Sequence, residues 1–91
     1  MSRSIEHNAA RQRFEWTEDG IVSELDYQLQ NGLMTITHTG VPEALGGRGI
    51  AADLTKFALE TARAEGWKVR PQCSYAAAYI RRHQEYADLV T

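Results

Sequence analysis

The chain has 91 residues, 43% of them hydrophobic and 24% charged, which is the composition of one globular domain and not of a disordered chain. Its formal net charge of −2 and the lack of a basic stripe argue against nucleic acid as a partner. A single cysteine and the absence of a long apolar run predict a cytoplasmic protein with no intrachain disulfide, signal peptide or membrane-spanning segment.

The first third of the sequence predicts two strands after a loose beginning. Residues 1–10 are polar, and we expect them to be frayed. Residues 11–17 are typical of a short strand, which the turn signal Asp19-Gly20 ends. Residues 21–30 then alternate between apolar and polar side chains, the pattern of a strand with one buried face.

A strong hairpin signal, Asn31-Gly32, separates this strand from the next one. Residues 33–39 alternate again, so they predict a third strand of an antiparallel meander. On this alternation His38 shares a face with Met34 and Ile36.

The second half of the chain changes to helical periodicity. Residues 47–65 predict a helix that ends at Gly66 and carries one apolar stripe, formed by Ile50, Leu54, Phe57, Ala58 and Ala62. Residues 67–72 predict a short strand, and Pro71 within it indicates a sheet edge or an interrupted ladder.

The end of the chain predicts a second helix, from a cap at Ser74 to about His83, followed by a short helical turn in the tail (85–91). The predicted order is therefore β-β-β-α-β-α. This order indicates an α/β (α+β) fold in which helices pack on a mostly antiparallel sheet.

The most informative segment is 41–51, which joins the third strand to the first helix and contains three closely spaced glycines. Glycine allows tight turns and close approach of a ligand to the backbone. The first turn of a helix leaves amide N–H groups unpaired at the positive end of the helix dipole, so the segment predicts a cradle for phosphate or pyrophosphate. Such glycines also occur simply to start helices, and the segment alone leaves both interpretations open.

Two reactive side chains stand at strand ends near this segment. His38 precedes the glycine loop and is either a satisfied, partly buried histidine or a general base. Cys73 precedes the last helix and is either a small buried side chain or a nucleophile activated by the helix N-terminus. A folded sheet could bring the two together.

Tyr75 and Tyr79 lie one turn apart on the last helix and so share a face. They either pack against the sheet or supply a phenol that protonates a thiolate leaving group. The chain's single cysteine and scattered histidines show no metal-ligand spacing, so we expect no metal site.

With these segments in hand, the chain resembles the minimal, single-domain GCN5-related N-acetyltransferases. The resemblance runs from about Leu33 to Leu89 and rests on separated blocks in the right order, which are Thr37-His38-Thr39, Val41-Pro42, Gly47-Arg48-Gly49-Ile50-Ala51, Leu54, Pro71-Gln72-Cys73-Ser74-Tyr75 and Glu85-Tyr86.

The resemblance implies that the protein binds acetyl-CoA, with its pyrophosphate on the backbone amides of residues 45–51 and its pantetheine arm where two strands splay near Pro71. It implies cofactor contacts from Val41, Leu45, Gly46, Gly47, Arg48, Gly49, Ile50, Ala51, Ser74, Tyr75 and Tyr79. It also implies that His38 and Cys73 lie near the acetyl group. Cys73 then either accepts the acetyl group as a thioester, with His38 as base, or an amine attacks acetyl-CoA directly.

Two positions depart from the family pattern. Ala44 stands where the signature has Gln or Arg, and His83-Gln84-Glu85-Tyr86 replaces a common His-Pro-Glu-Tyr. The resemblance implies an N-acetyltransferase acting on an amine, either a small molecule or protein-borne, as a monomer or weak homodimer. The alternative is a non-catalytic acyl-CoA-binding module in which His38 and Cys73 are structural.

Overall fold

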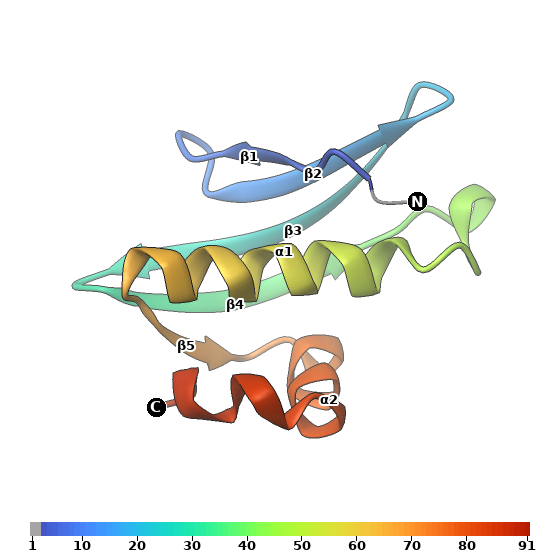
Figure 1. Ribbon diagram of the computed structural model, residues 1–91. Helices are drawn as coiled ribbons and strands as arrows, with labels where there is room; N and C mark the ends of the chain where they lie inside the picture. The colour runs from blue at the N-terminus through green and yellow to red at the C-terminus, as the bar shows by residue number, and fades with distance from the viewer. Residues whose placement is uncertain (1–2) are drawn as a thin grey trace.

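A computed structural model describes residues 3–91 as one five-stranded sheet with helices packed on it (Figure 1). The strands are β1 (Glu6–Asn8), β2 (Arg13–Glu18), β3 (Ile21–Gln30), β4 (Leu33–Gly40) and β5 (Lys68–Pro71), the helices are α1 (Ile50–Glu65) and α2 (Ser74–Arg82), and the 3₁₀ turns are η1 (Glu43–Leu45) and η2 (Gln84–Leu89). The strand order is β1-β2-β3-β4-β5. The predicted α+β fold, with helices on a mostly antiparallel sheet, is confirmed.

The start of the chain is more ordered than we predicted. Residues 6–8 form β1, which pairs antiparallel with β2, and Ile5 is buried in the core. The frayed start predicted for 1–10 is therefore wrong from residue 3 onward, and residues 1–2 lie outside the described part. The observed order is β-β-β-β-α-β-α, one strand longer than predicted. Polar residues form this strand because β2 supplies the ladder and a single apolar side chain anchors it.

Two tight turns connect β2, β3 and β4 as the sequence predicts. Asp19 and Gly20 both have positive φ angles, of 53° and 73°, and Asn31 and Gly32 have φ angles of 52° and 78°. Two successive positive φ values are the geometry that matches the twist of a hairpin. Both turn predictions are confirmed, and β2 itself runs over 13–18, two residues later at its start than predicted.

One face of the sheet is apolar and carries the helices. Its largest fully buried side chains include Phe14, Leu25, Met34 and Ile36, and these pack against Leu54 and other residues of the α1 stripe. Phe57, predicted in that stripe, is instead 38% exposed and meets Phe14 edge-on at 5.6 Å. The opposite face, which we call the open face, carries polar side chains from β2, β3 and β4, namely Glu15, Glu24, Asp26, Gln28 and His38.

A β-bulge in β4 explains why His38 lies on the open face. Tyr27 pairs with Ile36 but Asp26 pairs with His38, so Thr37 is an extra residue in the strand. The hydroxyl of Thr37 donates a hydrogen bond to the backbone oxygen of Asp26 at 3.3 Å. An extra residue reverses the alternation beyond it. The predicted face of His38, shared with Met34 and Ile36, is therefore wrong.

The starts of both helices differ from the predicted ones, α1 beginning later and α2 one residue earlier. Helix α1 begins at Ile50 and not at Gly47, because Gly47 and Gly49 adopt left-handed φ angles of 79° and 77°. Cys73, and not Ser74, occupies the N-cap position of α2, and no side chain caps that helix. Strand β5 is an edge strand, as Pro71 indicates, and it pairs in parallel with β4.

Candidate functional site

The loop between β4 and α1 leaves a group of backbone amides without helical partners. The first backbone hydrogen bond of α1 is donated by Asp53 to the carbonyl oxygen of Gly49 at 3.1 Å. The amides of residues 50–52 therefore have no acceptor within the helix. A Cβ built at Gly47 or Gly49 meets no atom within 4 Å, so there is open space beside the loop. These features make an anion cradle at the positive end of the helix dipole.

Side chains from outside the loop hold it in place. Arg3 forms an ion pair with Asp53 and donates a hydrogen bond to the carbonyl oxygen of Arg48 at 2.5 Å. The guanidinium of Arg48 forms an ion pair with Glu18, which lies at the end of β2. The side chain of Arg48 is thus committed to the fold, which leaves its backbone as the part directed to a ligand.

A cavity of about 240 Å³, which we call the loop cavity, lies against this segment. Eight of the predicted cofactor-binding residues line it, namely Val41, Leu45, Gly46, Gly47, Gly49, Ile50, Ala51 and Tyr75. The side chains of Leu45 and Ile50 are buried in the core, so these two residues can offer only backbone atoms to a ligand.

The ladder between β4 and β5 stops halfway along β4. Ile36 and Pro71 form its last pair, and the amides of Gln72 and Cys73 both donate to the carbonyl oxygen of Ile36, at 3.1 Å and 2.9 Å. Strand β4 continues to Gly40, so residues 37–40 have no strand partner on that side within the described chain. This open edge of β4 leads directly into the glycine loop. Pro71 interrupts the ladder as predicted.

Cys73 lies beside the open edge of β4. Its Sγ atom is 3.6 Å from the hydroxyl oxygen of Thr39. Burial raises the pKa of the Cys73 thiol, but hydrogen bonds from the Ala76 amide, the Thr39 hydroxyl and the Tyr75 amide outweigh burial and leave the pKa below its ordinary value. The thiol is therefore more easily ionised than a free cysteine.

His38 lies on the open face with a carboxylate partner. Its Nε2 atom is 3.4 Å from Oε2 of Glu24, and its side chain is 58% exposed. Gly40 makes this approach possible, since a Cβ at that position would lie 2.5 Å from Glu24 Oε2 and 2.8 Å from His38 Nε2. An exposed imidazole can accept a proton from a reacting group, and the contact with Glu24 holds the ring in one orientation.

The structure brings His38 and Cys73 to the same end of β4 but not into contact. Cys73 contacts Thr39, which pairs with the buried Leu25, whereas His38 pairs with Asp26 on the open face. Each has its own polar partner, Thr39 for the thiol and Glu24 for the imidazole.

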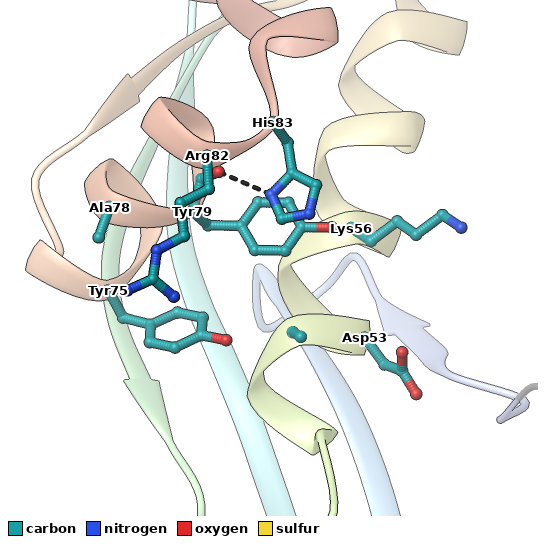
Figure 2. Close-up of a pocket in the computed structure, with 8 residues that line it drawn as sticks. Asp53, Lys56, Tyr75, Ala78, Tyr79, Arg82 and His83 are labelled. Carbon is teal, nitrogen blue, oxygen red and sulfur yellow. Dashed lines mark hydrogen bonds between the residues drawn. The ribbon is translucent and has the colours of Figure 1, made fainter.

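Tyr75 and Tyr79 share a face of α2, as their spacing predicts. Both line a second cavity, of about 320 Å³, between α1 and α2, which we call the interhelix cavity (Figure 2). Burial raises the pKa of both phenols, which keeps them protonated at neutral pH. Ser74 is exposed at the first position of α2.

Comparison with known proteins identifies the family. The family profile described as GCN5-related N-acetyltransferase matches residues 13–89. The chain belongs to the GCN5-related N-acetyltransferase family. The NATD1 proteins of human, mouse and chicken are each 31% identical to it over 83 residues, covering 87% of this chain and 73% or 74% of the relative. A GCN5-like protein from Staphylococcus aureus, solved by NMR, matches with a TM-score of 0.76 and 29% identity, over 100% of this chain and 91% of that one.

Membership confirms the resemblance found in the sequence and carries a general expectation, since proteins of the GCN5-related N-acetyltransferase family use acetyl-CoA and an acceptor. The departure at Ala44 falls in η1, where its side chain is exposed and lines no wall of the loop cavity. None of the helices within residues 3–91 is long and apolar enough to cross a membrane.

Sequence reasoning missed several residues of this candidate site. Glu24 is one of many charged residues in the alternating strand, and only the bulge brings it to His38. Gly40 carries no turn signal, and its role appears only through the crowding around it. Lys56 and Arg82 line the interhelix cavity. Arg82 lies one helical turn after Tyr79 and two turns after Tyr75, and this spacing was the available signal for Arg82.

Proposed function

We propose that this protein binds acetyl-CoA and transfers its acetyl group to an amine. The observation that supports this best is the continuity between the open edge of β4 and the amide cradle at α1. An elongated ligand that carries amides in one part and a pyrophosphate in the adjoining part fits this arrangement. Its amides can pair with the open edge of β4, and its pyrophosphate can lie in the amide cradle. Family membership supports the same choice of ligand.

The binding part of the proposal uses mainly backbone atoms. The amides of residues 47–51 hold the pyrophosphate, and the glycines allow it to approach without a Cβ in the way. The predicted range of 45–51 begins two residues too early, because the amides of Leu45 and Gly46 already donate to the carbonyl oxygens of Pro42 and Glu43. Residues 37–40 offer free strand edge to the amides of the pantetheine arm, as an added strand would use it. Because backbone groups do this work, Ala44 in place of Gln or Arg is compatible with binding.

The transfer part of the proposal uses His38. The nitrogen of a neutral amine attacks the thioester carbonyl carbon, a C–N bond forms, and the excess proton passes to the imidazole directly or through one water. The C–S bond then breaks, and coenzyme A leaves as a thiolate that takes a proton from a phenol, Tyr75 or Tyr79, or from water. Glu24 orients the ring, which makes it a positioning residue.

A second route runs through Cys73. Its lowered thiol pKa favours a thiolate that attacks the thioester carbonyl carbon, so that the C–S bond to coenzyme A breaks and coenzyme A leaves as a thiolate. The amine then attacks the acetyl-cysteine, and the Cys73 thiolate is the leaving group. The separate partners of His38 and Cys73 favour direct attack with His38 as the base, because the imidazole is not in contact with the thiol that it would have to deprotonate.

Two measurements test the proposal. Calorimetric titration with acetyl-CoA is expected to show one site per chain. Release of coenzyme A thiol is then followed with a panel of polyamines, amino acids and lysine peptides, and His38→Ala is expected to slow it by about 10²-fold or more. A protein that binds no acetyl-CoA at millimolar ligand overturns the whole proposal. One that binds it but turns over no amine is the non-catalytic acyl-CoA-binding module.

Intact mass after incubation with acetyl-CoA separates the two routes. Direct attack predicts an unmodified protein whose turnover survives Cys73→Ala. One added acetyl group on the wild type, absent from Cys73→Ala, together with loss of turnover in that variant, favours the acetyl-cysteine route. Turnover that survives both His38→Ala and Cys73→Ala removes both residues from the mechanism.

A further inference from the structure

A third hollow of the molecule, which we call the open-face pocket, lies on the side of the sheet that carries no helix. It holds about 480 Å³, and its lining includes side chains from β3, β4, β5 and the residue after β5, namely Gln28, Thr35, Arg70 and Gln72. The strand neighbours of these residues, such as Tyr27 and Val69, are buried on the helix side. Because side chains alternate along a strand, the pocket belongs to the open face.

The open-face pocket begins next to His38. Asp26 pairs with His38 between β3 and β4, and Gln28 is the next residue of β3 on the same face, roughly 7 Å along the strand. On the β5 side, the amide of Gln72 donates to the carbonyl oxygen of Ile36 at 3.1 Å, just before the bulge. A molecule whose amine lies at the imidazole can therefore have its remaining atoms in the pocket.

The open-face pocket carries positive charge. Arg70 is exposed on the edge strand β5, and in the part of the chain that the structure describes it forms no ion pair. The other described side chains of the lining are amides, a hydroxyl and an aliphatic group, so no carboxylate neutralises the guanidinium. A guanidinium is a planar donor that matches the two oxygens of a carboxylate. A carboxylate is therefore the ligand group that suits this pocket.

The part of the open face around His38 has the opposite charge. Glu24 lies 3.4 Å from the imidazole, and Glu15 pairs with Glu24 directly across the strands. Arg13 lies 2.9 Å from Asp26 and 3.6 Å from Glu15, so one guanidinium serves these two carboxylates and none pairs with Glu24. This end attracts an ammonium group, whereas the pocket attracts a carboxylate. A ligand that carries both groups matches the two ends.

We propose that the acceptor is a primary aliphatic amine with a carboxylate several carbons away, and that Arg70 binds this carboxylate in the open-face pocket. Arg70 is one strand across from His38, about 4.8 Å, and further along the sheet, which is more than the one-carbon spacing in an α-amino acid. The carbon chain then lies over Gln28 and Thr35. This inference rests on the proposed function, because transfer at His38 sets where the amine lies, and it adds the chemical class of the acceptor.

The test compares two amines that differ only in the charge at the far end, ε-aminocaproate and its neutral amide. Release of coenzyme A thiol by the wild type is expected to give about fivefold higher kcat/KM for the acid, as an exposed ion pair provides. Arg70→Gln is expected to bring this ratio close to one by lowering kcat/KM for the acid. Arg70→Glu is expected to reverse the preference, so that hexamethylenediamine reacts faster than ε-aminocaproate.

Lys68→Gln is the matched control, because it removes a positive charge from the same strand. The Lys68 ammonium donates to the carbonyl oxygen of Asp88 at 3.1 Å, and the residue lies outside the pocket lining. This variant is expected to keep the wild-type ratio, and urea unfolding checks that all three variants fold.

Two results would overturn the acceptor class while the proposed function stands. One is equal kcat/KM of the wild type for the acid and the amide, and the other is an equal fall of the ratio in Lys68→Gln and Arg70→Gln. Absence of coenzyme A release with every amine tested is a different result, since it removes acetyl transfer itself and the acceptor class with it.

Discussion

At the scale of single residues, Gly40 sets the environment of His38. The imidazole and the Glu24 carboxylate meet in the space that a Cβ at position 40 would fill. The backbone there is ordinary strand, so glycine is needed for room and not for an unusual φ angle. The position of the proposed base, His38, therefore depends on the lack of a side chain at Gly40.

We expect Gly40→Ala to change the free energy of unfolding little and to lower the rate of acetyl transfer strongly. The displaced atoms are the ends of two side chains, so the free energy of unfolding should change by less than about 1 kcal/mol. The rate of acetyl transfer should fall at least about tenfold, because the imidazole is pushed from its position. Urea unfolding and kcat/KM measure the two effects.

The double variant supplies the control for that experiment. In a His38→Ala background, Gly40→Ala should cause no further loss of transfer, since its effect acts through the imidazole. Additive losses would mean that Gly40 acts elsewhere, for instance on the path of the strand.

The Cys73 thiol offers a test by pH. The hydroxyl of Thr39 helps to lower the thiol pKa, so Thr39→Val should raise the pKa toward its ordinary value. A smaller thiolate fraction at neutral pH should slow alkylation by iodoacetamide several-fold, with the rate recovering as the pH rises. Thr35→Val, on the same strand, should alkylate at the wild-type rate.

At residue scale the sequence identified the reactive side chains near the loop but not their neighbours. His38 and Cys73 were found from residue type and position near a loop. Their partners Glu24 and Thr39 could not be found, because an unbroken hairpin from Asn31-Gly32 places Leu25 opposite His38. One extra residue at Thr37 shifts that pairing to Thr39, and alternation of apolar residues gives no sign of it.

At the scale of elements, the glycine loop was the most predictable part of the site. The strand before it, the glycines and the helix after it all have strong local signals, and the structure places them in that order. The predicted start of α1 was three residues too early, because the spacing of apolar residues does not reveal that the preceding glycines adopt a left-handed conformation. Strand β1 was missed because its residues are polar and its order comes from pairing with β2.

Two glycines allow the role of the loop to be tested against a matched control. Gly47 and Gly20 have φ angles of 79° and 73°, and neither has an atom within 4 Å of a Cβ built on it. Alanine at either position should lower the free energy of unfolding by about 1–2 kcal/mol, the cost of a left-handed L-residue. Only Gly47→Ala should also weaken acetyl-CoA binding, because Gly20 lies in the β2–β3 turn. Chemical denaturation and calorimetry measure the two effects, and equal affinities in both variants would remove Gly47 from the cradle.

At the scale of the whole molecule, the helices, both cavities and the open edge of β4 share one core. The chain is short, so its stability margin is small and a bound ligand should change it measurably. We expect acetyl-CoA at 100 times its Kd to raise the free energy of unfolding by about 2.7 kcal/mol. Trp16 and Trp67 fluorescence and far-ultraviolet circular dichroism should give one coincident urea transition with and without ligand. Transitions that separate would contradict a single domain.

The bulge at Thr37 also bears on the order in which two substrates can bind. Neighbouring residues of a strand point to opposite sides of the sheet, and the bulge determines that Thr39 points toward the helices and His38 toward solvent. A thioester held on the helix side and an amine from the open face would approach the end of β4 from opposite faces of the sheet. Neither substrate would then block the binding of the other. We therefore expect binding in random order, seen in calorimetry as binding of each substrate in the absence of the other. Double-reciprocal plots should then intersect, whereas an acetyl-cysteine route would give parallel lines.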